Sequence, residues 1–340
     1  MKAAVFEKTG KLSVQDKPIP KLAPGDVLIK VDWCGICASD LAALNGDVTD
    51  YSPPVVMGHE LAGVVVESRH PAVRAGERVT VNPMLSCGSC GYCQADLDKY
   101  CSHIEGIGHD IDGGYAEYLR MPKHGVDTGK LISVPDTISP EELLFLEPLG
   151  CCINAMRETL FDKRVAILGA GSIGLMFAQL TKKAGLQTYV LEPLVHRRGV
   201  ADNVGADASF DITADGVETL IEMTKGGVEA VISATTNDQR AIDLAFKVVR
   251  RGGNMNFFGL APKGQELKIN LEHFHYMGHK LMASWAFSRW SLNESRRMLI
   301  AGEINLKPLL TNRFSIERAI EGFENARQRR GVKSVLGGCS

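Results

Sequence analysis

Four cysteines lie close together in the spacing C-x2-C-x2-C-x7-C: Cys87, Cys90, Cys93 and Cys101. Two-residue gaps let one loop place several thiolates around a single ion, and tetrahedral zinc needs four such ligands. Because four thiolates leave no coordination position open, this spacing predicts a structural zinc site. An iron–sulfur cluster is the main alternative, but bacterial ferredoxins follow the same opening with a three-residue gap and a cysteine before proline. Here the last gap is seven residues and Ser102 follows.

A second set of possible metal ligands lies upstream of this cluster. Asp40 follows Cys37 closely, and His59, in the triplet Gly58-His59-Glu60, comes twenty-two residues after Cys37. A thiolate, an imidazole and a carboxylate suit a zinc ion that keeps its fourth position open for a substrate. This set predicts a catalytic zinc site.

A third motif, G-x-G-x-x-G at residues 169–174, follows a buried-strand pattern and opens a helical one. The first glycine permits a tight turn, the second lets a pyrophosphate approach bare backbone, and the third lets the helix lie close to the sheet. The context predicts a dinucleotide-binding loop. The residues expected to bind the cofactor are Gly169, Gly171, Ser172, Ile173, Gly174, Glu192 and Arg197.

Glu192 closes the next predicted strand, eighteen residues after the last glycine of this loop. Its carboxylate would accept hydrogen bonds from the ribose hydroxyls of the adenosine and would repel a 2′-phosphate, so NAD is favoured over NADP. His196, Arg197 and Arg198 would offset part of that repulsion.

The elements that must position these residues fall into two kinds. Before residue 150, short β-like segments separated by glycine, proline and aspartate indicate an irregular barrel or sandwich. After Cys151, strand patterns at 164–169, 188–192, 228–234 and 254–260 alternate with helical patterns at 172–185, 216–225 and 239–251. This alternation predicts an α/β domain with a doubly wound parallel sheet.

The composition narrows the classes of function. With 45% hydrophobic and 23% charged residues and a net charge of −2, the chain lacks a basic surface for nucleic acid or membrane lipid. The N-terminus does not have the pattern of a secretory signal, and the longest apolar run is too short and glycine-rich for a membrane span. We therefore expect a cytoplasmic protein, in which thiols stay reduced and bind metal more readily than they form disulfides.

These motifs, taken in order, resemble the zinc-dependent medium-chain dehydrogenases, among them sorbitol, galactitol and L-threonine dehydrogenases. The resemblance covers essentially the whole chain and includes the Cys37 segment, the Gly-His-Glu triplet, the four-cysteine lobe, Glu147-Pro148 and the glycine loop. It implies a GroES-like catalytic domain at residues 1–150 and 285–340, which carries the zinc lobe, and a Rossmann domain at 151–284. It also implies two zinc ions per chain and a homodimer or homotetramer.

The resemblance assigns roles around the catalytic zinc. Cys37 and His59 look like zinc ligands, Asp40 resembles the carboxylate that orients the ligating histidine, and Ser39 resembles the hydroxyl that takes the substrate's proton. Glu60 and Glu147 are both candidates for the third ligand, and they could exchange during turnover.

Two further positions bear on this assignment. Cys151 is a less favoured third ligand. Many relatives carry a histidine three residues after the relay hydroxyl, where this chain has Ala42, so the proton must leave by another route.

The implied reaction is reversible oxidation of a secondary alcohol to a ketone, with hydride transfer to NAD. The resemblance of Glu147-Pro148 to sorbitol-, galactitol- and threonine-type members favours a polyol or sugar-derivative substrate, with L-threonine and a hydroxy acid or sugar acid as alternatives. Outside the enzyme class, the chain could be an NAD(H)-binding protein with structural zinc only. Residues expected to shape the substrate pocket are Trp33, Tyr51, Arg289 and Trp290. Cys34, Cys152 and Cys339 are expected to be ordinary thiols.

Overall fold

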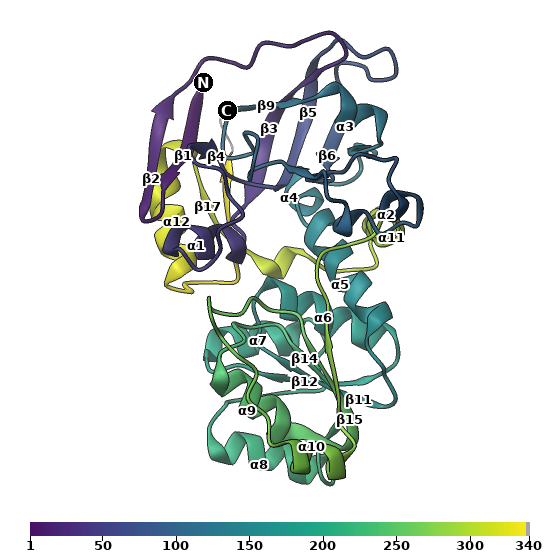
Figure 1. Cartoon of the computed structure of the whole chain (residues 1–340). Helices are drawn as coiled ribbons and strands as arrows, with labels where there is room; N and C mark the ends of the chain where they lie inside the picture. The colour runs from purple at the N-terminus through teal and green to yellow at the C-terminus, as the bar shows by residue number, and fades with distance from the viewer. Residues whose placement is uncertain (338–340) are drawn as a thin grey trace. The chain divides into compact units, whose positions relative to one another are not determined.

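The chain folds into two units, as a computed structural model of residues 1–337 shows (Figure 1). The first unit comprises residues 1–150, 287–303 and 310 to the end of the described chain, and the second comprises 151–286 and 304–309. Cys339 lies outside the described residues. Within residues 1–337, no helix is both long and apolar enough to cross a membrane.

The first unit is built mainly from short strands, as its frequent glycine, proline and aspartate residues predict. Its strands are β1 (Lys2–Lys8), β2 (Lys11–Asp16), β3 (Val27–Gly35), β4 (Val55–Val56), β5 (Glu60–Ser68), β6 (Arg78–Val81), β7 (Met84–Leu85), β8 (Glu105–Gly106), β9 (Tyr118–Met121), β10 (Leu131–Ser133), β17 (Leu310–Phe314) and β18 (Lys333–Gly337). Its helices are α1 (Ala38–Asn45), α2 (Gly91–Gln94), α3 (Lys123–Asp127), α4 (Pro140–Leu143), α11 (Arg289–Ile300) and α12 (Ala319–Arg327).

Strand β3 is the centre of this unit. The main sheet has the order β10-β6-β5-β3-β18-β17, with β9 also paired to β3, and a smaller sheet has the order β2-β1-β4. Alternate residues of β3, such as Val27, Ile29 and Val31, are buried in one apolar cluster with Val65 and Val79. Lys30, Asp32 and Trp33 are only partly buried, as expected where one face of a strand meets the core.

The second unit contains a parallel sheet in the order β13-β12-β11-β14-β15-β16. In Figure 1 its strands run between α6 and α7 on one side and α8, α9 and α10 on the other. This confirms the predicted doubly wound parallel sheet. The strands are β11 (Arg164–Leu168), β12 (Gln187–Leu191), β13 (Ala208–Phe210), β14 (Val228–Ser233), β15 (Val249–Phe257) and β16 (Lys280–Ala283). The helices are α6 (Ser172–Lys183), α7 (Val195–Asn203), α8 (Ala214–Met223), α9 (Gln239–Val248) and α10 (Leu271–Met277), and α5 (Leu146–Glu158) crosses the boundary between the units.

One predicted helix ends earlier than its sequence pattern indicates. The pattern at 239–251 continues to Arg251, but α9 ends at Val248 and β15 begins at the next residue. Val248, at the end of the helix, and Val249, at the start of the strand, are both buried. Because both residues are apolar, the sequence pattern does not reveal the boundary between helix and strand.

Candidate active site

The register of two strands brings the predicted zinc ligands together. In the antiparallel pair β3–β5, Gly35 lies opposite Glu60. Cys37 follows β3 by two residues and His59 directly precedes β5, so both fall at the same end of the pair. One ligand atom from each of Cys37, His59 and Glu60 lies within 4.8 Å of the others, which is compact enough for a single ion.

Strand β18 adds a lysine that the sequence analysis did not single out. Val335 lies opposite Gly35 on the other side of β3, which carries Lys333 to the same end of the sheet. Lys333 is buried and forms an ion pair with the Glu60 carboxylate. Burial opposes a charged lysine, but Glu60 and Cys37 outweigh burial and raise the pKa of Lys333.

The charges of this cluster fit a divalent cation. Cys37 and Glu60 lie in one compact group with His59, Asp40 faces the imidazole, and Lys333 pairs with Glu60. A thiolate, an imidazole and a carboxylate are ligands that zinc accepts. Burial lowers the pKa of the His59 imidazole, yet Asp40 and Cys37 raise it well above its ordinary value, so the surroundings favour positive charge here.

Asp40 is held more tightly than the resemblance alone implies. Its Oδ1 accepts a hydrogen bond from the Tyr51 hydroxyl at 3.0 Å, and its Oδ2 accepts from the Tyr115 hydroxyl at 2.6 Å and the Cys37 N–H at 3.1 Å. The distance from Oδ1 to His59 Nδ1 is 3.7 Å, beyond a normal hydrogen bond. Asp40 therefore faces the imidazole while two tyrosines fix its orientation.

Ser39 lies beside the same tyrosine. The Tyr51 hydroxyl is 3.4 Å from Ser39 Oγ, so the expected relay hydroxyl, Tyr51 and Asp40 form one connected polar group. Tyr51 is also the expected pocket residue that the structure places next to the ligand cluster.

The remaining candidates for the third ligand differ in position. Glu147, in α5, is buried and close enough to His59 to favour its charged form, but it is outside the compact group of Cys37, His59 and Glu60. Cys151 belongs to the second unit.

The four-cysteine cluster forms a cage in the first unit. The Sγ–Sγ distances are 3.5 Å for Cys90–Cys93, 3.5 Å for Cys87–Cys101 and 3.9 Å for Cys87–Cys93. A tetrahedral zinc with Zn–S bonds of about 2.3 Å requires sulfur atoms about 3.8 Å apart. These separations suit one ion, leave no room for a multi-atom cluster and are too long for disulfides. None of the eight cysteines within residues 1–337 is in a disulfide.

The local backbone prepares this cage for metal binding. N–H groups of Ser89 and Cys90 donate hydrogen bonds to the Cys87 sulfur and lower the pKa of its thiol to about 5. Since zinc binds the thiolate, a thiol that ionises below neutral pH is a ready ligand.

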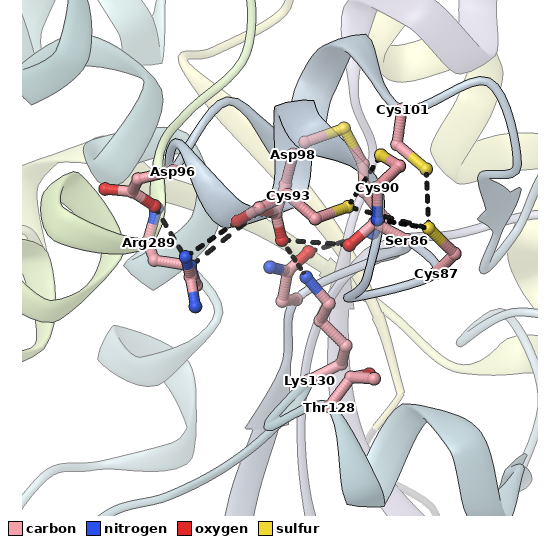
Figure 2. A network of polar contacts seen from close by, with 12 residues as sticks. Ser86, Cys87, Cys90, Cys93, Asp96, Asp98, Cys101, Thr128, Lys130 and Arg289 are labelled. Carbon is pink, nitrogen blue, oxygen red and sulfur yellow. Dashed lines mark hydrogen bonds and ion pairs between the residues drawn. The ribbon is translucent and has the colours of Figure 1, made fainter.

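A polar network joins the zinc lobe, residues 86–102, to the rest of the first unit (Figure 2). Asp98 accepts a hydrogen bond from Ser86 at 2.8 Å and forms a buried ion pair with Lys130. The Arg289 guanidinium donates to Asp96 Oδ1 at 3.1 Å and to the Cys93 carbonyl at 2.9 Å. Arg289, expected in the substrate pocket, therefore holds the lobe against the start of α11.

The glycine loop has the geometry that a dinucleotide-binding turn requires. Gly169 has φ +96°, a conformation that favours glycine, and its N–H donates to the Leu191 carbonyl at 2.8 Å. Gly171 is the N-cap of α6, with the Arg197 guanidinium nearby. A Cβ at Gly174 would overlap the Gly169 carbonyl oxygen. The loop therefore packs closely against the first turn of α6, where backbone N–H groups can bind a phosphate.

Glu192 lies at the end of β12 and is tied to this loop. One carboxylate oxygen accepts from the Ala170 N–H at 2.8 Å and the other from the Leu194 N–H at 3.0 Å. Arg198 donates to the Glu192 and Pro193 carbonyls and to Asp211, so its guanidinium is already engaged.

Two family models match the chain. The Alcohol dehydrogenase GroES-like domain matches residues 23–135, and the Zinc-binding dehydrogenase model matches residues 172–300. The two matches cover both units and include every predicted zinc ligand except Glu147.

Curated relatives span almost the whole chain. It is 30% identical to a sorbitol dehydrogenase of Bacillus subtilis (strain 168), over 96% of this chain and 94% of the relative. It is 29% identical to an L-threonine 3-dehydrogenase of Rhizobium etli (strain CIAT 652), over 99% and 98%.

A solved structure shares the fold. A protein described as a zinc-binding dehydrogenase from Sinorhizobium meliloti 1021, bound to NADP, superimposes with a TM-score of 0.89 at 30% identity, over 98% of each chain.

Proposed function

The chain belongs to the zinc-dependent medium-chain dehydrogenases, and from this membership we propose that it oxidises a secondary alcohol of a polyol or sugar derivative to a ketone. Hydride transfer to NAD would accompany the oxidation, and the reaction would be reversible. The observation that carries the proposal is the compact group of Cys37, His59 and Glu60 beside Ser39. The sorbitol dehydrogenase relative supports the polyol class.

In this proposal Cys37, His59 and Glu60 hold the catalytic zinc, and the four cysteines of the lobe hold a structural one. When bound, the catalytic zinc supplies a Lewis acid that lowers the pKa of the substrate hydroxyl. Ser39 would accept the hydroxyl proton at Oγ and hand on its own proton, through the Tyr51 hydroxyl 3.4 Å away, to the Asp40 carboxylate. The chain of Ser39, Tyr51 and Asp40 partly compensates for Ala42, where relatives carry a histidine.

Lys333 bears on the choice of third ligand. Its ion pair with Glu60 would give that carboxylate a partner when it does not bind the metal. Glu147, which is buried, would then be the carboxylate available as the third ligand.

A spectrophotometric screen of NAD reduction tests the proposed function. Zinc-replete protein is incubated with sugar alcohols, L-threonine and simple secondary alcohols. We expect the highest kcat/KM with a sugar alcohol. The absence of NAD reduction with every alcohol in the screen would contradict the proposal. A preference for L-threonine would support the second candidate, which the L-threonine 3-dehydrogenase relative favours.

The zinc content per chain distinguishes the proposed enzyme from a non-catalytic NAD(H)-binding protein. Two zinc ions per chain would support the enzyme, whereas one ion, bound by the lobe, would support a binding protein with structural zinc only.

Exchanging Glu192 for alanine is expected to weaken NAD binding about tenfold or more, because hydrogen bonds to a charged group contribute about 1.5–3 kcal/mol each. The exchange also removes the negative charge that disfavours a 2′-phosphate, so the preference for NAD over NADP should narrow. Titrating the variant and the wild type with NADH and NADPH by fluorescence checks both effects. An unchanged NADH affinity would count against the ribose role, and NADP preference in the wild type would align this chain with its NADP-bound relative.

We also propose a cytoplasmic homodimer or homotetramer. Strand β16 is at the edge of its sheet, and Leu271 and Tyr276 on the neighbouring α10 are 72% and 71% exposed. Unpaired strand edges and exposed apolar side chains favour association with a second copy. Sedimentation at a multiple of the 36.9 kDa chain mass is expected, and a monomer would contradict it.

A further inference from the structure

A histidine outside every motif discussed above lies next to the candidate zinc site. The ring of His109 is 5.4 Å from the ring of His59, centroid to centroid, and tilted by 51° to it. Its side chain is only 22% exposed. A mostly covered imidazole here is costly to desolvate unless its nitrogen atoms find hydrogen-bond partners.

Close backbone packing fixes His109 beside His59. Gly108, with φ +82°, approaches Gly58 so closely that a Cβ at Gly108 would be 2.8 Å from the Gly58 carbonyl oxygen. The Ser52 N–H donates to the His109 carbonyl at 2.9 Å. Gly58 and Gly108, which precede the two histidines, are therefore in contact with each other. This contact places the His59 and His109 side chains close together.

The His109 ring itself is held from two sides. It stacks on Tyr51 with centroids 4.0 Å apart and planes 22° apart, and its Nδ1 is 3.7 Å from the Asp50 carboxylate. With Nδ1 on the Asp50 side, Nε2 is the ring nitrogen left for a ligand. Tyr51 in turn donates to Asp40, so one polar group connects the imidazole to the candidate catalytic site.

We propose that His109 selects substrates that carry a second hydroxyl beside the carbinol carbon, by hydrogen bonding to that hydroxyl. The inference rests on the proposed function, because it places the reacting hydroxyl at the group of Cys37, His59 and Glu60. The two oxygens of a vicinal diol are only one carbon–carbon bond apart along the chain, so one substrate could present one oxygen to the zinc ligands and the other to His109, whose ring lies 5.4 Å from that of His59. A simple alcohol would cover Nε2 without offering it a hydrogen-bond partner, so a site of this kind discriminates against it.

Two alcohols that differ by one hydroxyl test this assignment in the zinc-replete holoenzyme: butane-2,3-diol, as separate stereoisomers, and butan-2-ol. The wild type should favour a diol. His109→Phe keeps an aromatic ring to stack on Tyr51 but removes both nitrogens. We expect the ratio of kcat/KM for diol over mono-alcohol to fall about 10- to 100-fold, chiefly through the KM of the diol. His124→Phe, the same exchange at a side chain 46% exposed, is the control and should leave the ratio unchanged.

A binding measurement provides a readout independent of turnover. The dissociation constant of each alcohol from the complex with NADH, followed by cofactor fluorescence, should rise for the diol and stay constant for butan-2-ol in His109→Phe. Equal losses with both alcohols, as expected for a general proton-transfer or structural role, would overturn the assignment, and so would an unchanged ratio. A wild type that neither oxidises nor binds any alcohol would overturn the proposed function, and the inference with it.

Discussion

Replacing Cys37 with serine is expected to lower kcat/KM for alcohol oxidation by at least about a thousandfold, and to reduce bound zinc from two ions per chain to one. A serine hydroxyl remains protonated near neutral pH and is a poor zinc ligand, whereas a thiolate contributes both charge and a short bond. Loss of the Lewis acid removes several kcal/mol of transition-state stabilisation, and each 1.36 kcal/mol is about a factor of ten in rate.

The measurement combines steady-state kinetics with elemental analysis of the dialysed protein. Cys151→Ser is the matched control because that cysteine, four residues after Glu147, is the less favoured ligand; this variant should keep both ions and most of its activity. If Cys37→Ser retained two zinc ions and normal turnover while Cys151→Ser lost one, the catalytic ion would have to lie elsewhere. Far-UV circular dichroism checks that neither exchange unfolds the chain.

The four-cysteine cage is the part of the site that local sequence predicts best. Its ligands lie within residues 87–101, so two-residue gaps limit how far the sulfur atoms can separate. The observed Sγ–Sγ distances of 3.5–3.9 Å agree with a single tetrahedral ion. Similarly, the glycine loop is short enough that its turn and its contact with α6 follow from the motif alone.

The second metal site depends on pairing that spacing cannot reveal. Cys37 and His59 meet only because Gly35 lies opposite Glu60 in the β3–β5 ladder, and a one-residue slip would have turned the side chains away. The residue types indicate a thiolate, an imidazole and a carboxylate as possible ligands, and the resemblance to known dehydrogenases assigns their roles, but neither reveals the pairing of the strands. Lys333 joins it from the last described strand, where its only local signal is a charged residue before the buried run Ser334–Leu336.

The contacts of Arg289 and His109 also could not be predicted from the local sequence. Arg289 is expected from the sequence to shape the substrate pocket, but its guanidinium binds the carboxylate of Asp96 on the zinc lobe. His109 has no motif around it. Its place beside His59 follows from the close approach of two glycines, Gly58 and Gly108, a tertiary contact between segments far apart in the sequence.

The largest effect on stability is expected at the base of the zinc lobe, where Lys130→Met removes the cation that pairs with Asp98. Both side chains are almost fully buried, with 2% and 6% exposure. Removing one partner of such a pair leaves an uncompensated charge and costs about 3–5 kcal/mol. We expect about 3 kcal/mol, the lower end, because Ser86 still donates to Asp98 and Arg289 is 3.8 Å away.

Urea unfolding of the zinc-replete protein, with the midpoint compared at constant slope, measures this loss. Lys123→Met is the matched control, since its ion pair with Asp127 is largely exposed and such pairs contribute at most about 1 kcal/mol. In the double variant Lys130→Met/Asp98→Asn, the buried charge is gone, so part of the stability should return. A Lys130→Met protein as stable as the control would mean that the cage and Arg289 alone secure the lobe.

The stability lost in Lys130→Met should depend on pH in a defined direction. Burial raises the pKa of Asp98, but its bonds to Lys130 and Ser86 outweigh burial and lower it below the ordinary value. A carboxyl group whose pKa is depressed in the folded state stabilises the fold above its unfolded pKa, and the stabilisation is lost as the pH falls through the folded pKa. The difference between wild type and Lys130→Met should therefore be full near neutral pH and shrink in acid. A difference that stayed constant into the acid range would point to lost packing of the lysine side chain rather than to its charge.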